Sequence, residues 1–322
     1  MEIEREIGRV FTDSVRELSR KIVDASSEIL TINNEALERD LASRLQTLQN
    51  EPKSNSDLFA DESLSPENEL GLNLFLDVVN FCYQNPYTQK SYEYINKEGK
   101  SKSRSTGLKA AMAESGINWG NTKEVADLTP EKWAEIIQLD KNKEFYLGTE
   151  RGKRIAGFAF TLAAHGFKNI TGFLTYVEYD TENLLPTLNG SGYFTDEFAK
   201  RSQLSVNMMD GVLKRRFSKE FKGMETLTVM ADYRLPQLMY NFGTIELAEN
   251  LRAKLMKQEI IETRSPEELA LRAATITVGE KLSKLMGMSE GQVDSLLWTL
   301  AGDLGRNGKL TIPHMLVPTD KY

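Results

Sequence analysis

The chain has 322 residues, a net charge of −7 and 40% hydrophobic residues. This length suits one large domain or two closely packed ones. The negative charge disfavours duplex nucleic acid, whose phosphates proteins neutralise with clustered lysine and arginine. No apolar run reaches the roughly 18 residues that span a bilayer, and the amino terminus lacks the features of a signal peptide. We therefore expect a cytoplasmic protein with no membrane association and no obligate protein partner.

The scarcity of cysteine and histidine restricts the available chemistry. Cys82 is the one cysteine and excludes an internal disulfide, and His165 and His314 leave too few soft ligands for a structural zinc site. Nucleophile systems that need a histidine base are disfavoured, because neither histidine lies in a recognisable signature. Carboxylates remain as the expected catalytic groups, and we expect no metal and no cofactor.

Helical patterns dominate the amino-terminal part of the chain. Apolar residues recur at steps of three and four over Glu2–Leu30 and over Asn33–Leu48, which predicts two amphipathic helices. The polar stretch Asn50–Asn68 predicts a flexible connection. We expect residues 1–66 to form a helical segment packed on a main domain of residues 67–322.

The next stretch, Glu69–Tyr83, is apolar on nearly every face, which predicts a buried central helix. Asp77 and Asn80 lie three positions apart and share a face of it. They either satisfy each other or face a ligand, and the sequence leaves both possibilities open. Tyrosines around a Lys-Glu-Gly turn in Ser91–Arg104 predict a small β-hairpin.

The middle of the chain continues mainly with helices. Thr129-Pro130-Glu131 predicts a helix start, and helical patterns follow over Phe145–Ala164, Ile170–Tyr179 and Asp196–Phe217. Asn183–Gly192 contains proline, asparagine and glycine and predicts a loop.

Two capping boxes mark the last helices. Ser265–Glu268 predicts a helix that runs to Met286, and Ser289 with Gln292 predicts one that runs to Asp303. Ile245–Met256 also has a helical pattern. The predicted fold is therefore mostly α, a bundle-like helical domain with one small β-hairpin.

The apolar segment Leu227–Gln237 carries a single acid, Asp232, two positions before Arg234. Pro236 suits the first turn of a helix and pushes Leu235 out of the α region, so we expect a helix to begin at Pro236. An acid among apolar residues needs a partner or a function. It is either an acid at a helix start paired with Arg234 or a catalytic group.

Motifs around this segment resemble the queuosine salvage proteins, the queuosine 5′-phosphate N-glycosylase/hydrolase family. The strongest match is Ala-Asp-Tyr-Arg-Leu-Pro-Gln at 231–237. The other motifs, in chain order, are Leu-Asp-Val-Val-Asn-Phe-Cys-Tyr at 76–83, Thr-Glu-Arg at 149–151, Phe-Ala-Lys-Arg-Ser-Gln at 198–203 and Val-Asp-Ser-Leu-Leu-Trp at 293–298. The resemblance implies a fold related to the helix-hairpin-helix DNA glycosylases, and hydrolysis of queuosine 5′-phosphate to release queuine for transfer RNA modification.

The resemblance also implies roles for individual residues. Asp232 matches the family's catalytic acid, and a fixed carboxylate can stabilise the positive charge that develops on the sugar or orient the attacking water. Asp294 and Trp298 are expected to grip the base. Lys200 and Arg201 are expected to bind the 5′-phosphate. Further substrate-binding candidates are Met230, Asp77, Asn80, Phe81, Arg234, Thr299 and His314.

Structural interpretations stay open for several of these residues. Trp298 suits a core aromatic equally well, and either Lys200 or Arg201 suits a helix surface, because adjacent helical residues point in different directions. Glu150 and Arg151 are expected to form a structural ion pair.

Some positions depart from the family's pattern and leave the specificity open. Met230 stands where an aromatic residue is usual, Gln84 where a tryptophan is usual, and Thr299 where an acid is usual. Another 7-deazaguanine nucleoside, or the unphosphorylated form, is therefore an alternative substrate. A non-catalytic protein that binds a modified nucleotide or a partner helix is a second hypothesis. A nucleic-acid base-excision enzyme is a third, which the net charge disfavours.

Overall fold

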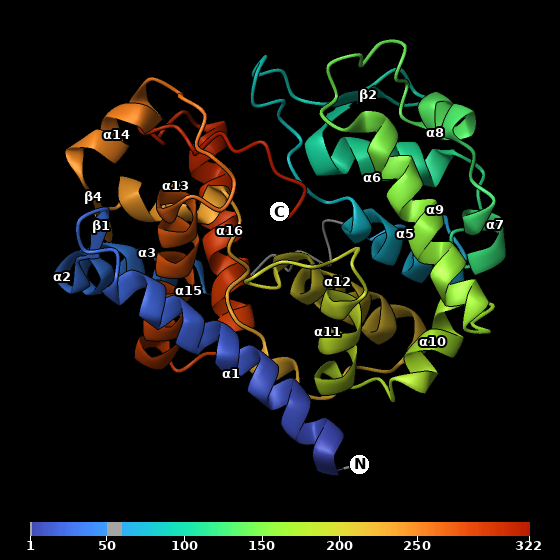
Figure 1. The fold of residues 1–322 in the computed structure, drawn as a ribbon, viewed down its shortest axis with the longest axis horizontal. Helices are drawn as coiled ribbons and strands as arrows, with labels where there is room; N and C mark the ends of the chain where they lie inside the picture. Colours follow the sequence, from blue (N-terminus) through green and yellow to red (C-terminus); the bar gives the residue numbers. More distant parts are fainter. Residues whose placement is uncertain (1, 50–59) are drawn as a thin grey trace. The chain divides into compact units, whose positions relative to one another are not determined.

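The protein is described here by a computed structural model of residues 2–49 and 60–322, shown in Figure 1. Helices dominate these residues, with two small antiparallel sheets, so the predicted mostly α fold is confirmed. None of the helices in the described ranges has the length and apolar character to cross a membrane. The connection predicted over Asn50–Asn68 falls partly on residues 50–59, which lie outside the described residues.

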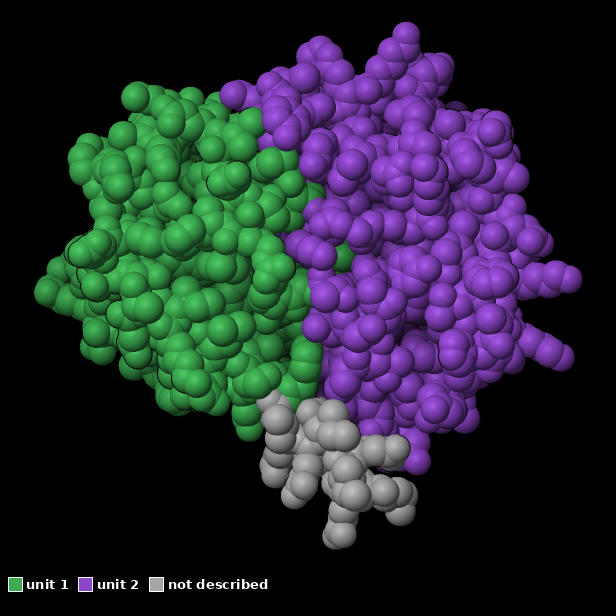
Figure 2. Space-filling view, viewed as in Figure 1, with its two compact units in different colours: residues 1–54, 196–203, 223–319 green, residues 55–195, 204–222, 320–322 purple. Residues whose placement is uncertain are grey.

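The chain divides into two compact units, coloured separately in Figure 2. Unit 1 contains residues 1–54, 196–203 and 223–319, and unit 2 contains residues 55–195, 204–222 and 320–322. Each unit is therefore assembled from segments that are far apart in the sequence.

Unit 1 is built around the helices α15 (Pro266–Met286) and α16 (Glu290–Arg306). Both start as predicted, because the hydroxyl groups of Ser265 and Ser289 accept hydrogen bonds from the backbone at Glu268 and Gln292. Helix α1 packs along α15 (Figure 1). The other helices of unit 1 are α1 (Glu2–Asp24), α2 (Asn34–Ala36), η1 (Leu37–Ala42), α3 (Ser43–Leu48), η3 (Met224–Thr226), α13 (Arg234–Asn241) and α14 (Glu249–Met256).

A two-stranded sheet in unit 1 replaces part of two predicted helices. Strand β1 (Leu30–Ile32) pairs antiparallel with β4 (Ile245–Leu247). Leu30 and Ile245 are buried, and the two backbones satisfy each other's hydrogen-bonding groups. The helix predictions were wrong here, since a local pattern does not reveal a strand partner from the other end of the chain.

Unit 2 is centred on α5 (Pro66–Val78), in which every residue from Glu69 to Val78 is buried. The prediction of a buried central helix is confirmed, and so is the hairpin, formed by β2 (Glu93–Ile95) and β3 (Ser101–Ser103). The other helices are α6 (Arg104–Glu114), α7 (Thr122–Ala126), α8 (Pro130–Ile136), α9 (Gly148–Ala164), α10 (Ile170–Tyr176), α11 (Thr181–Gly190), α12 (Lys200–Val212), whose first residues belong to unit 1, and η2 (Leu213–Phe217).

Most of the predicted loop at Asn183–Gly192 is instead part of α11, which ends at Gly190. Asp180 caps this helix by accepting a hydrogen bond from the Glu182 amide at 2.9 Å. Three leucines of the helix are fully buried, namely Leu184, Leu185 and Leu188. Burying such side chains stabilises by about 1.5–3 kcal/mol each, which offsets the roughly 3 kcal/mol cost of an interior proline, Pro186.

Arg151 is fully buried in unit 2 and binds the chain that follows α5. Its guanidinium donates hydrogen bonds to the carbonyl oxygens of Val79 and Phe81 and lies 4.0 Å from the centre of the Phe81 ring. Glu150 instead pairs with Lys153 at 2.7 Å. The predicted ion pair between Glu150 and Arg151 is therefore wrong, because backbone carbonyls take the place of the carboxylate.

Candidate active site

Asp232 lies on a segment of unit 1, residues 227–232, between η3 and α13. All six residues of this segment are buried, but they belong to no helix or strand. Buried backbone groups outside regular structure need hydrogen-bond partners from side chains. Three buried polar side chains, Gln203, Asp294 and Arg272, supply them.

Gln203, on the first turn of α12, binds the start of this segment. Its Oε1 accepts a hydrogen bond from the Thr228 amide at 2.6 Å, and its Nε2 donates to the Thr228 hydroxyl at 2.9 Å. Nε2 also donates to the carbonyl oxygen of Phe198 at 3.2 Å. The Phe-Ala-Lys-Arg-Ser-Gln motif therefore fixes the segment that carries Asp232.

Arg272, on α15, fixes the residue just before Asp232. Its Nε donates to the carbonyl oxygen of Ala231 at 3.0 Å, and its two terminal nitrogens form a bidentate pair with Asp196 at 2.8 and 2.7 Å. Burial opposes the charge of Asp196, yet the Arg272 guanidinium holds the pKa of that carboxyl below its ordinary value. This pair was not predicted from the sequence, although the charged Arg272 inside an apolar run was a signal that it needs a buried partner.

The Asp232 carboxylate is fixed through one of its two oxygens. Oδ1 accepts hydrogen bonds from the backbone amides of Arg234 at 2.7 Å and Leu235 at 3.0 Å. These two bonds start α13 at Arg234, so the predicted start at Pro236 was wrong. The proline occupies the third position of the helix, where no intrahelical donor is needed. In the described part of the chain, every hydrogen bond of Asp232 is on Oδ1.

Arg234 contributes its backbone amide, and not its charge, to Asp232. Its guanidinium donates to the carbonyl oxygen of Ala301 at 3.1 Å and lies 5.6 Å from the Trp298 ring. Among the described residues, Asp232 takes part in no ion pair. The alternative of a structural Asp232–Arg234 ion pair therefore does not describe this site.

Asp294, on α16, is the second acid of the site. Its Oδ1 accepts the Met230 amide at 2.9 Å. Burial raises the pKa of Asp294 to about 7; the Met230 amide and the Lys200 charge oppose the rise, and the charge of Asp232 adds to it. Near neutral pH Asp294 can therefore either donate or accept a proton.

The remaining predicted residues of unit 1 have varied surroundings. Trp298 is only half-buried, so it is not a fully enclosed core aromatic. The Thr299 hydroxyl donates to the Ser295 carbonyl of its own helix at 2.8 Å. The His314 ring lies 4.9 Å from that of Tyr233, a neighbour of Asp232 that was not predicted as a site residue. Met230, Lys200 and Arg201 are buried.

Three predicted residues lie in unit 2, at the end of α5. The Asn80 side chain donates to Asp77 Oδ1 at 2.8 Å, so these two polar groups bind each other. Phe81 packs against the Arg151 guanidinium. Their part in substrate binding stays a prediction. Within residues 2–49 and 60–322, no group of three or more histidine, cysteine or acidic side chains is arranged to hold a metal ion.

The fold and the two neighbouring acids define a helical protein with a carboxylate site. Residues 62–317 match the family model described as queuosine salvage protein, and the chain belongs to this family. The predicted resemblance is thereby confirmed.

Relatives with curated names agree with this membership. A protein of Sphaerobacter thermophilus is 30% identical over 244 residues, covering 70% of this chain and 73% of the relative. A protein of Dictyostelium discoideum is 24% identical over 304 residues, covering 86% of this chain and 89% of the relative. Both are named queuosine 5′-phosphate N-glycosylase/hydrolase.

Proposed function

We propose that this protein hydrolyses the N-glycosidic bond of queuosine 5′-phosphate. Water adds to the sugar carbon C1′, the bond from C1′ to the base nitrogen breaks, and the products are ribose 5-phosphate and free queuine. The family membership and the names of the relatives support this substrate. A free mononucleotide also fits the net charge of −7, since it demands no extended basic surface. We place the reaction in the cytoplasm.

The geometry of Asp232 is the observation that carries the proposal. Two backbone amides fix Oδ1, and Oδ2 makes no hydrogen bond within the described chain. A carboxylate held in this way keeps its position while its second oxygen faces a positively charged sugar or an attacking water. This geometry suits a nucleophile, a base or a charge stabiliser equally, because each role requires a fixed carboxylate at one face of the sugar.

Neighbouring residues suit the other parts of the substrate. Asp294 is protonated for part of the time near neutral pH and can hydrogen-bond the base in either form. Trp298 is half-buried and offers an indole face for stacking. Lys200 and Arg201 begin the 13-residue helix α12, and a helix N-terminus with two cations favours a phosphate. We assign the base to Asp294 and Trp298, and the 5′-phosphate to Lys200 and Arg201.

The proposal is tested by incubating the protein with queuosine 5′-phosphate and measuring free queuine by mass spectrometry. The matched control is Asp232→Asn, whose amide oxygen can still accept the two backbone hydrogen bonds. We expect the wild-type protein to release queuine and the variant to be slower by about 10²-fold or more, a loss typical for removing one charge-stabilising group.

Three outcomes would contradict parts of the proposal. No release by the wild-type protein would overturn the activity, and equal release by Asp232→Asn would overturn the role of that residue. Release from guanosine 5′-phosphate at the same rate would overturn base specificity. Faster release from the unphosphorylated nucleoside would show the shifted preference that Met230 and Thr299 leave open.

A further inference from the structure

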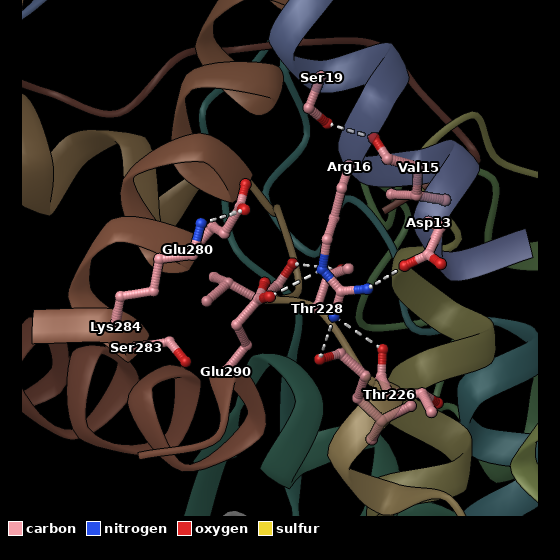
Figure 3. Close-up of polar contacts among 12 residues, drawn as sticks. Asp13, Val15, Arg16, Ser19, Thr226, Thr228, Glu280, Ser283, Lys284 and Glu290 are labelled. Carbon is pink, nitrogen blue, oxygen red and sulfur yellow. Dashed lines mark hydrogen bonds and ion pairs between the residues drawn. The ribbon is translucent and has the colours of Figure 1, made fainter. Parts of the chain in front are cut away.

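Helix α1 precedes residues 62–317, the part that matches the family model, yet one of its side chains binds both elements that carry the two acids of the candidate site. Arg16 is largely buried, with 14% of its side chain exposed. Its guanidinium group has partners on three sides, which Figure 3 shows. These contacts connect α1 with the segment that carries Asp232 and the helix that carries Asp294.

The first set of contacts holds the start of the segment that carries Asp232. Arg16 Nη2 donates to the carbonyl oxygen of Thr226 at 2.9 Å (Figure 3). It also lies 3.4 Å from the carbonyl oxygen of Leu227. These carbonyls come immediately before Thr228, which Gln203 holds. Arg16 therefore extends the set of side chains that fix this segment to its amino-terminal end.

The second contact holds the start of the helix that carries Asp294. Arg16 Nε binds Glu290 Oε1 at 2.8 Å, and Glu290 is the first residue of α16 (Figure 3). Asp294 and Trp298 follow Glu290 at four and eight positions, on the same face of the helix. One guanidinium thus binds both the segment with Asp232 and the helix with Asp294.

Helix α1 is itself fixed at this point. Val15 belongs to a buried apolar cluster that includes Ala231, the residue next to Asp232, together with Phe198, Ala273 and Ile276. The side chain before Arg16 therefore belongs to the same apolar cluster as a residue of the segment that Arg16 binds. This packing determines where the guanidinium group lies.

We propose that Arg16 is a positioning residue, which sets the distance between Asp232 and Asp294 by binding the backbone before one and the helix of the other. The proposal rests on the proposed function, since it assumes that both acids act on one substrate. An arginine is required because its planar group donates in several directions at once, whereas lysine offers a single nitrogen. Arg16 touches no substrate in this role.

The test compares Arg16→Ala and Arg16→Lys with Arg20→Ala in the queuine-release assay. Arg20 is one turn further along α1 and pairs with Glu280 at 3.2 Å, but 52% of its side chain is exposed and none of its contacts reaches the segment. It is the matched control for losing an ion pair between α1 and its neighbours. Melting temperatures of all variants separate a loss of stability from a loss of positioning.

We expect Arg16→Ala to lower kcat by about 10–10²-fold with a smaller change in KM, because small displacements of catalytic groups reduce the rate at this scale. Arg16→Lys should recover only part of the loss, and Arg20→Ala should keep kcat within about two-fold. Should Arg16→Ala fail to fold, Arg16→Lys and Glu290→Gln decide the matter, and each should lower kcat relative to Arg20→Ala.

Other results overturn the proposal. If the folded Arg16 variants keep the wild-type kcat, Arg16 only stabilises the fold. The same conclusion follows if Arg20→Ala lowers kcat as much as Arg16→Ala does and the two variants have equal melting temperatures. A change confined to KM would also exclude positioning. In those cases the wild-type protein still releases queuine, so the proposed function stands. A wild-type protein that releases no queuine overturns both.

Discussion

Asp232 and Asp294 are both buried acids whose carboxylates bind the backbone through one oxygen. Oδ1 accepts two backbone amides in Asp232 and one in Asp294, and in the described chain neither acid has a hydrogen bond on its second oxygen. The hydrogen bond on Oδ1 fixes the side chain, and the proposed function requires the second oxygen to face the substrate. Burial has a cost for Asp294, however, because an ionised carboxylate is poorly solvated there.

This cost predicts that Asp294→Asn stabilises the protein at high pH. The folded pKa of Asp294, about 7, lies above its ordinary value of 3.8. The folded state therefore holds the proton more tightly, so the free energy of unfolding falls as the pH rises from about 4 to about 7 and stays lowered above that. A shift of this size corresponds to roughly 4 kcal/mol. Asparagine keeps the acceptor for the Met230 amide and removes the charge.

The measurement is thermal unfolding of both proteins at pH 5 and pH 8. We expect the melting temperature of Asp294→Asn to exceed that of the wild type by more at pH 8 than at pH 5. Asp303→Asn, on an exposed part of the same helix, is the control and should change stability by less than about 1 kcal/mol at either pH. An advantage of Asp294→Asn that is independent of pH would show that Asp294 is not the titrating group.

At the scale of elements, local patterns in the sequence predicted where helices form, but they did not predict which elements contact one another. The N-caps Ser265 and Ser289 were found because each signal lies within four consecutive residues, although only Ser289 forms the full capping box and Glu268 binds the Arg264 amide instead. The β1–β4 pair and the binding of Ala231 by Arg272 join distant parts of the chain and leave no local pattern. Asp232 was found as an acid in an apolar run, but the groups that fix it were not.

One such contact gives a prediction about α15. A Cβ atom added at Gly279 would lie 2.2 Å from Val229 Cγ2, in the segment before Asp232. Alanine is normally better than glycine inside a helix by about 1 kcal/mol, but here overpacking should reverse the sign. We expect Gly279→Ala to destabilise by about 1–3 kcal/mol and to lower queuine release, since Val229 must move.

Gly291 is the matched control, because it lies in α16 and an added Cβ meets nothing within 4 Å. Gly291→Ala should leave stability unchanged or raise it by up to about 1 kcal/mol. Chemical denaturation measures both variants. A Gly279→Ala protein as stable and as active as Gly291→Ala would mean that the segment yields to the new methyl group without cost.

At the scale of the whole molecule, the order of segments in the chain limits how the protein can be divided. Unit 1 takes residues from the beginning, the middle and the end of the sequence, and α12 starts in unit 1 and continues in unit 2. A division into residues 1–66 and 67–322, expected from the sequence, would remove the amino-terminal helices from α15 and α16, against which α1, η1 and α3 pack.

We therefore predict that residues 67–322 alone do not form the native, active protein. Removing the amino-terminal helices uncovers apolar surface that is otherwise buried by Val15, Leu37, Leu41 and Leu45. Surface of this kind stabilises by about 25 cal/mol per Å² when it is buried, so its exposure should cause aggregation or binding of a hydrophobic dye. Dye fluorescence, circular dichroism and the queuine assay would measure the change.

Supplying residues 1–66 as a separate chain is the control, because it restores the missing surface without the covalent connection. We expect co-expression to recover folded protein and part of the activity, since the contacts of Arg16, η1 and α3 can form between two chains. If a fragment of residues 67–322 is monomeric, binds no hydrophobic dye and is fully active, the amino-terminal helices are dispensable. It would also contradict the positioning role of Arg16, because that role requires α1 to be present.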